Sequence, residues 1–115
     1  MPLTLRETLL SMKDATVETV TIPEWGNREV RVRSLTAAER DHFERRVLKS
    51  GDDISGLKAL LATMTVVDDD NERVFTEADI PALQGKNAAV LDRVWQTAQR
   101  LSNLLDEDVE TLAGN

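Results

Sequence analysis

Two stretches near the N-terminus, 17–22 and 28–33, alternate apolar and polar residues. This period of two is typical of strands that have one buried face. The five residues between them, PEWGN, have the composition of a turn. The sequence therefore predicts a two-stranded antiparallel β-hairpin over about 17–33, whose apolar side consists of Val20, Ile22, Val30 and Val32.

After the hairpin, apolar residues recur at helical spacings. Thr36 and Glu39 match the capping-box pattern, which predicts a helix that starts here and ends at Gly51. Phe43 and Val47 lie four residues apart, so they share the apolar face of this helix. A two-stranded hairpin is only marginally stable alone. We therefore expect its apolar side to rest on helices or on another molecule.

A second helix is expected after Asp52 or Asp53, either of which can act as its N-cap. Its apolar residues recur at steps of three and four, at Ile54, Leu57, Leu61 and Met64. The helix leads through two valines into the polar run 68–72, which predicts a surface turn.

The C-terminal part predicts three helices of unequal length. Thr76 and Asp79 again form a capping pattern, but Pro81 limits that helix to a turn or two. The strongest helical pattern follows from Lys86 to about Ser102. A last short helix is expected over 107–113. The apolar stripe of the long helix consists of Val90, Leu91, Val94, Trp95, Ala98 and Leu101.

A short helix from Leu5 to Met12, capped by Thr4, precedes the hairpin. It is barely three turns long and needs packing to persist. Together these elements predict a mainly α protein with four to six helices and one N-terminal two-stranded antiparallel β-hairpin. Residues 1–115 are expected to form a single domain, with its helical part at about 36–113.

The composition excludes several classes of protein. The chain has no cysteine, so disulfides, Cys-ligated zinc, iron–sulfur clusters and thiol catalysis are excluded. No stretch approaches the roughly 20 apolar residues that cross a bilayer, so we expect no membrane span. The net charge of −7 repels nucleic acid phosphates and anionic lipids, so we expect neither nucleic acid nor a membrane as a partner.

The charge is unevenly distributed along the chain. Residues 1–50 have a net charge of +1, whereas residues 51–115 have a net charge of −8. If the two parts present different surfaces, copies can associate head to tail into rings or helical filaments. The alternative is that the acidic part is simply solvated.

Candidate residues for catalysis or metal binding are few. His42, the only histidine, lies within a predicted helix among charged residues, which is typical of a surface position. Asp68, Asp70 and Glu72 alternate like the start of a calcium loop, but Arg73 stands at the sixth position, where such a loop needs glycine. A solvated acidic turn fits better. We therefore expect no catalytic residue, no metal and no cofactor.

The remaining candidates are residues that could bind a protein partner. Trp25 lies at the predicted hairpin tip, either exposed as an aromatic anchor or folded back over the helices. Arg31 and Arg33 lie on the polar side of the hairpin. Leu104 and Leu105 follow a predicted helix break, where they form either a contact surface or local core.

The order of these segments resembles that of tail assembly chaperones of long-tailed, siphovirus-type bacteriophages. The similarity covers the hairpin and the next helix start, ETVTIPEWG at 18–26 and VRVRSLTAAER at 30–40. It continues through VVDDDNERVFTEADI at 66–80, the long helix at 90–95, LS at 101–102 and DEDVE at 106–110. The sequence departs from the pattern at Asn71-Glu72, where such proteins often have glycine.

This resemblance implies a small, largely helical, oligomer-forming protein without enzymatic activity. Such a chaperone holds the long tape measure protein soluble and brings tail tube subunits to it in the host bacterial cytoplasm, and it is absent from the mature virion. The alternative is a small structural tail or connector protein that is retained in the virion.

Overall fold

The computed structural model describes residues 2–51, 53 and 55–104. This part of the chain is mainly α-helical and contains one small sheet. The N-terminal elements are α1 (Leu5–Ser11), β1 (Val17–Ile22), the 3-10 turn η1 (Pro23–Trp25) and β2 (Arg28–Arg33). They are followed by α2 (Ala37–Ser50), α3 (Leu57–Thr65), β3 (Val66–Val67), the 3-10 turn η2 (Glu77–Asp79), α4 (Ile80–Gln84) and α5 (Ala88–Ser102).

The predicted hairpin is confirmed, and its strands have the predicted bounds. The strands β1 and β2 pair in antiparallel register, with Val20 opposite Val30. The sequence predicted a sheet of two strands, but the sheet has three. The additional strand β3 pairs with β2 in antiparallel orientation, which gives the order β1-β2-β3. Val66 and Val67 form this third strand directly after α3. A strand of two residues is too short to show an alternating pattern, so the sequence pattern could not indicate it.

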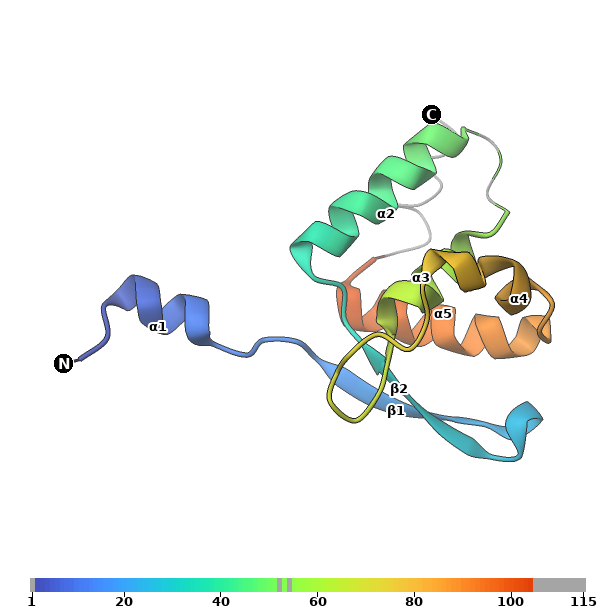
Figure 1. Ribbon diagram of the computed structural model, residues 1–115, viewed down its shortest axis with the longest axis horizontal. Helices are drawn as coiled ribbons and strands as arrows, with labels where there is room; N and C mark the ends of the chain where they lie inside the picture. Colours follow the sequence, from blue (N-terminus) through green and yellow to red (C-terminus); the bar gives the residue numbers. More distant parts are fainter. Residues whose placement is uncertain (1, 52, 54, 105–115) are drawn as a thin grey trace.

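The core lies between the sheet and the helices. Figure 1 shows the hairpin along one side of the molecule and α2 on the other, with α3 and α5 between them. The helix α5 packs on both α3 and the first two strands. Phe43 of α2 contacts Trp95 of α5, with ring centroids 6.1 Å apart. The largest completely buried side chains are Phe43, Ile22, Leu60, Leu61, Met64 and Leu104.

The starts of two helices follow the prediction. The Thr36 Oγ1 atom accepts a hydrogen bond from the backbone N–H of Glu39 at 3.1 Å, and Glu39 Oε1 accepts one from the backbone N–H of Thr36 at 2.8 Å. This capping box opens α2. At the start of α5, the Asn87 side chain accepts a hydrogen bond from the backbone N–H of Ala89 at 2.9 Å.

The start of α3 corrects the prediction. The helix begins at Leu57, and its N-cap is Gly56 with φ +80° rather than an aspartate. The Asp53 carboxylate is used instead in a turn, where it accepts hydrogen bonds from the Ser55 backbone N–H at 3.0 Å and hydroxyl at 2.6 Å. Asp52 and Ile54 lie outside the described residues. The competing Asx turn therefore delays the helix start.

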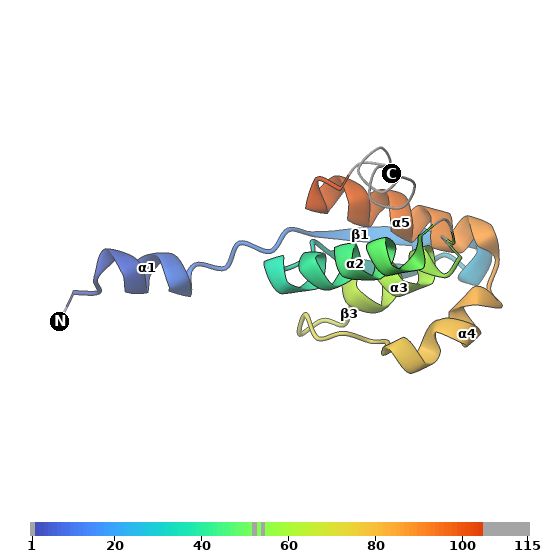
Figure 2. The same cartoon turned by 90° about the horizontal axis from the view of Figure 1, so that it is seen from above.

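The N-terminal helix α1 stands apart from the rest of the molecule. Figures 1 and 2 both show it beyond the start of β1, joined to it by an extended segment. Its predicted N-cap is confirmed, because Thr4 Oγ1 accepts a hydrogen bond from the backbone N–H of Glu7 at 3.1 Å. None of the seven residues of α1 is buried.

None of the helices in the described ranges is long and apolar enough to cross a membrane. The predicted helix at 107–113 lies outside the described residues.

Candidate functional site

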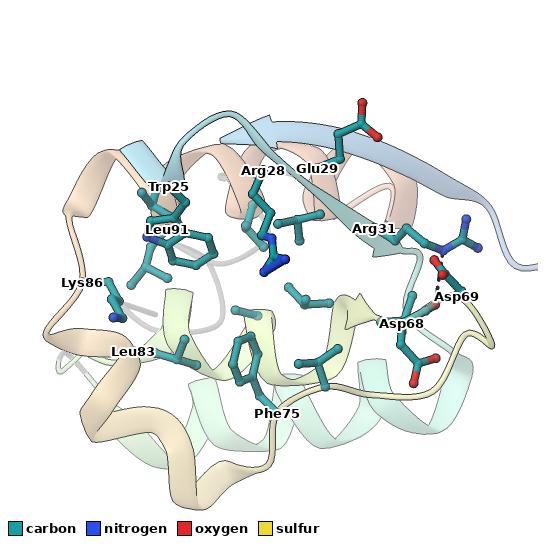
Figure 3. A pocket seen from close by; sticks show the side chains of 17 residues that line it. Trp25, Arg28, Glu29, Arg31, Asp68, Asp69, Phe75, Leu83, Lys86 and Leu91 are labelled. Atoms are coloured by element: carbon teal, nitrogen blue, oxygen red, sulfur yellow. Dashed lines mark hydrogen bonds between the residues drawn. The ribbon is translucent and has the colours of Figure 1, made fainter. Parts of the chain in front are cut away.

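A groove with a volume of about 850 Å³ opens beside strand β2. Its walls come from β2, β3, α3, α4, the start of α5 and the chain that follows the acidic turn. In Figure 3, Phe75 and Leu83 lie on one side of the groove, opposite the hairpin residues. Its apolar lining includes Val30, Val67, Val74, Phe75, Leu83 and Leu91.

The lip of the groove is built by the chain that returns from the acidic turn. The Val74 backbone N–H donates to the carbonyl oxygen of Val66 at 3.2 Å, and Val67 forms an isolated bridge with Arg73. This pairing places Val74 and Phe75 along the groove. The Val74 side chain remains 52% exposed, and Phe75 is half-buried. Neighbouring exposed apolar side chains of this kind are typical of a surface that binds another molecule.

Trp25 lies at one end of the groove, near Lys86 and Leu91 (Figure 3). Its side chain is half-buried, so Trp25 is both folded back and partly open to solvent. The neighbouring Glu24 accepts a hydrogen bond from Arg93 Nη2 at 2.9 Å, which ties the hairpin tip to α5. That hydrogen bond lowers the pKa of Glu24.

Arg31 lies at the other end, beside Asp68 and Asp69 (Figure 3). Its Nε donates to the carbonyl oxygen of Asp68 at 3.2 Å, and its Nη2 donates to Asn71 Oδ1 at 2.7 Å. Arg31 thus holds the acidic turn against β2. The groove therefore has a basic and aromatic end at Trp25 and Lys86, and an end of mixed charge at Arg31.

The acidic turn is closed by its own hydrogen bonds. Asp68 Oδ1 accepts from the backbone N–H groups of Asp70 at 2.8 Å and Glu72 at 3.1 Å. In the part of the chain that the structure describes, no three histidine or acidic side chains are grouped so as to hold a metal ion.

Arg33 lies outside the groove, in an ion-pair cluster. Its Nη2 donates to the two oxygens of Glu39 at 2.7 and 2.6 Å and to the Met64 carbonyl oxygen at 3.0 Å. Arg73 pairs with the same carboxylate. The side chains of Arg33 and Glu39 are only 13% and 8% exposed. Arg33 is thus enclosed by its own chain, and we leave it out of the candidate groove.

The other predicted partner residues are also away from the groove. Leu104 is completely buried and belongs to the hydrophobic core, as the local-core alternative expected. Leu105 lies outside the described residues.

His42 is part of a surface ion pair between α2 and η2. Its Nε2 lies 3.0 Å from Glu77 Oε2, and Arg46 contacts the other oxygen of Glu77. Hydrogen bonding from Arg46 lowers the pKa of Glu77, desolvation opposes this shift, and His42 adds to it. These three side chains join two elements, with no nucleophile among them.

The sequence pattern did not indicate Val74 and Phe75 as residues of a surface groove. Phe75 is partly buried and packs against the core, whereas Val74 is 52% exposed. One signal was available in the sequence. Only two apolar residues follow the turn, and in an extended segment two successive side chains point to opposite faces, so one of them faces outward.

Comparison with known proteins gives a consistent result. A sequence model of the phage tail assembly chaperone family matches residues 4–112. The fold is similar to that of the tail assembly chaperone of bacteriophage HK97, with a TM-score of 0.64 and 20% sequence identity over 88% of this chain and 96% of that chain. No curated protein matches the chain. The family match covers nearly the whole sequence, including α1 and every groove-forming element, and the chain therefore belongs to the phage tail assembly chaperone family.

Proposed function

We propose that this chaperone acts by non-covalent binding, and that its groove receives the apolar face of helical segments of the tape measure protein. The observation that carries the proposal is the open groove, in which Val74 and Phe75 remain partly exposed beside Trp25. Amphipathic helices bind such grooves through apolar residues at helical spacings. No catalytic step is part of this role.

Binding by many copies suits a long and aggregation-prone partner. A single groove of this size offers only modest affinity, but copies that bind along one extended chain multiply modest affinities. The net charge of −7 on each copy then keeps the coated partner apart from other coated chains. Before they bind the partner, free copies would associate head to tail into a ring or a helical array.

The coated tape measure protein would in turn recruit tail tube subunits. In this scheme the chaperone acts in the host bacterial cytoplasm and leaves before the virion is complete. The groove is consistent with such release, because Val74 and Phe75 at its lip are partly exposed and it would hold its partner by apolar contact rather than by a covalent bond.

Co-expression with the tape measure protein of the same phage tests the proposal. The wild-type chaperone should keep that protein in the soluble fraction, and Val74→Glu should reduce the soluble amount at least tenfold, because it adds a charge to the apolar lip. Leu48→Glu is the matched control. Leu48 is 58% exposed on α2 and does not line the groove, so this variant should behave like the wild type.

Two results would contradict the proposal. If Val74→Glu solubilises the tape measure protein as well as Leu48→Glu does, the groove is not the binding site. If purified virions contain the protein in a fixed ratio to the tail tube, the alternative role as a small structural tail or connector protein is supported instead.

A further inference from the structure

The helix α1 carries apolar side chains that are exposed on the surface. Leu5, Leu9, Leu10 and Met12 are each between 57% and 74% exposed. Leu5, Leu9 and Met12 follow the spacing i, i+4, i+7, so they form one face of the helix and its end. Glu7 lies on the opposite face. This arrangement is typical of a helix that binds in a groove of another molecule.

A helix of seven residues is too short to be stable in water by itself, since isolated helices below about 12 residues are marginal. Its capping bond from Glu7 to Thr4 provides only part of the stabilisation that it needs. The family match nevertheless begins at residue 4, so α1 lies within the region that the family shares. A packing partner for the apolar face accounts for both facts.

The position of α1 favours a partner in another copy. The helix lies beyond the start of β1 and points away from the rest of the molecule in both views (Figures 1 and 2). The groove runs along β2 and β3, whereas α1 is joined to β1 at the opposite edge of the sheet. No described residue of α1 or β1 lines the groove. The N-terminal arm, which consists of α1 and the segment that joins it to β1 (residues 2–16), therefore extends away from the groove of its own chain.

Charge favours the same arrangement. The four charged residues within 1–16 cancel one another, so the whole net charge of −7 is carried by residues 17–115. Two such bodies repel each other when they approach directly. A neutral apolar arm can bind an acidic body without that repulsion, and the groove is the apolar surface that this body offers.

We propose that α1 of one copy binds in the groove of a second copy, with Leu5, Leu9 and Met12 as its anchors. This inference deepens the proposed function, because it rests on the groove being a binding surface and assigns the occupant that the tape measure protein replaces. Each contact leaves one free arm and one free groove at the ends of the assembly. Copies therefore add head to tail until a ring closes or a filament grows.

Disulfide trapping tests this contact on the full chain, which contains no cysteine of its own. Leu9→Cys is mixed with a size-tagged Val74→Cys variant, and both positions are solvent-exposed, so the substitutions leave the core intact. We expect the tagged heterodimer to form at least fivefold faster than with Glu7→Cys, which places the thiol on the opposite face of α1. Equal rates for the two arm variants overturn the proposal.

The double variant, Leu9→Cys with Val74→Cys in one chain, distinguishes an arm that binds the groove of another copy from an arm that binds the groove of its own chain. Disulfide-linked ladders of several chains support binding between copies. A cross-link formed only within one chain places the arm in its own groove and overturns the proposal.

Sedimentation velocity distinguishes this inference from the proposed function. Leu9→Glu should lower self-association at least tenfold and still keep the tape measure protein soluble, whereas Val74→Glu should lose both properties. If the Leu9–Val74 cross-link is absent while Val74→Glu loses the tape measure protein, only the arm contact is wrong. If the cross-link forms while Val74→Glu retains that protein, the proposed function is wrong and the arm contact is supported.

Discussion

The Glu39 carboxylate holds the guanidinium group of Arg33, whose Nη2 donates to its two oxygens at 2.7 and 2.6 Å. The same carboxylate caps α2 through the Thr36 backbone N–H. Arg33 in turn reaches the carbonyl oxygen of Met64 near the end of α3. This one pair therefore fastens strand β2, helix α2 and helix α3 to one another at the rim of the core.

Replacing Glu39 with alanine should lower the free energy of unfolding by about 3 kcal/mol. The substitution leaves the Arg33 guanidinium enclosed without its counter-charge and removes half of the capping box. Urea denaturation followed by circular dichroism measures the change. Glu44→Ala is the control, since Glu44 forms an i, i+4 pair with Arg40 on the same helix that is more open to solvent than the Arg33–Glu39 pair, and its loss should cost about 0.5 kcal/mol. Equal losses in the two variants would contradict this role of Glu39.

Acid should destabilise the fold partly through Glu39. Burial acts to raise the pKa of Glu39, but hydrogen bonds from Thr36 and Arg73 and the charges of Arg33 and Arg73 together lower it. A carboxyl group with a lower pKa in the folded state stabilises the fold above its unfolded value of about 4.3, and this stabilisation is lost as the pH falls through the folded value. Melting temperatures from pH 7 to pH 3 should therefore fall less steeply for Glu39→Gln than for the wild type. If melting temperature falls with pH equally in the two proteins, other carboxylates account for the loss of stability in acid.

Gly56→Ala should destabilise the start of α3. Gly56 has φ +80°, and a Cβ atom there would lie 3.4 Å from Gln84 Nε2. Left-handed backbone costs a residue with a side chain about 1–2 kcal/mol, and asparagine tolerates it better than alanine. We expect a loss of about 1.5 kcal/mol for Gly56→Ala and a clearly smaller loss for Gly56→Asn, measured by urea denaturation. The reverse order would show that contact with Gln84, rather than backbone strain, limits this position.

Elements that depend on nearby residues could be predicted from the sequence, whereas elements that depend on distant residues or on competing local structures could not. The hairpin, the capping box at Thr36 and the stripe of α5 were predictable, because each depends on residues close together in the chain. The third strand and the start of α3 were not. The strand β3 depends on pairing with β2 over 30 residues away, and the α3 start depends on whether Asp53 caps a helix or closes a turn.

The same distinction applies to the candidate site. Trp25 and Arg31 were predictable as partner-binding candidates, since an aromatic residue at a hairpin tip and an arginine on a polar strand face are local features. Their places at opposite ends of one groove depend on the tertiary fold. Arg33 follows the same alternation as Arg31, but its guanidinium group is held by Glu39 and by the carbonyl oxygen of the distant Met64. Sequence periodicity contains no information about such neighbours.

Trp25 should report directly on occupancy of the groove. The chain has two tryptophans, and Trp95 is buried against Phe43, whereas Trp25 is half-buried at the groove end. Acrylamide should therefore quench mainly Trp25, and the quenching should fall when the tape measure protein binds, because a helix in the groove covers the indole. Trp25→Phe should abolish this change, since only Trp95 then emits. Trp25→Ala should also weaken binding about thirtyfold, the loss of roughly 2 kcal/mol that is common for a tryptophan that anchors an interface. Quenching that stays the same in the complex, in a wild-type protein that demonstrably binds, would place the tape measure protein on another face of the molecule.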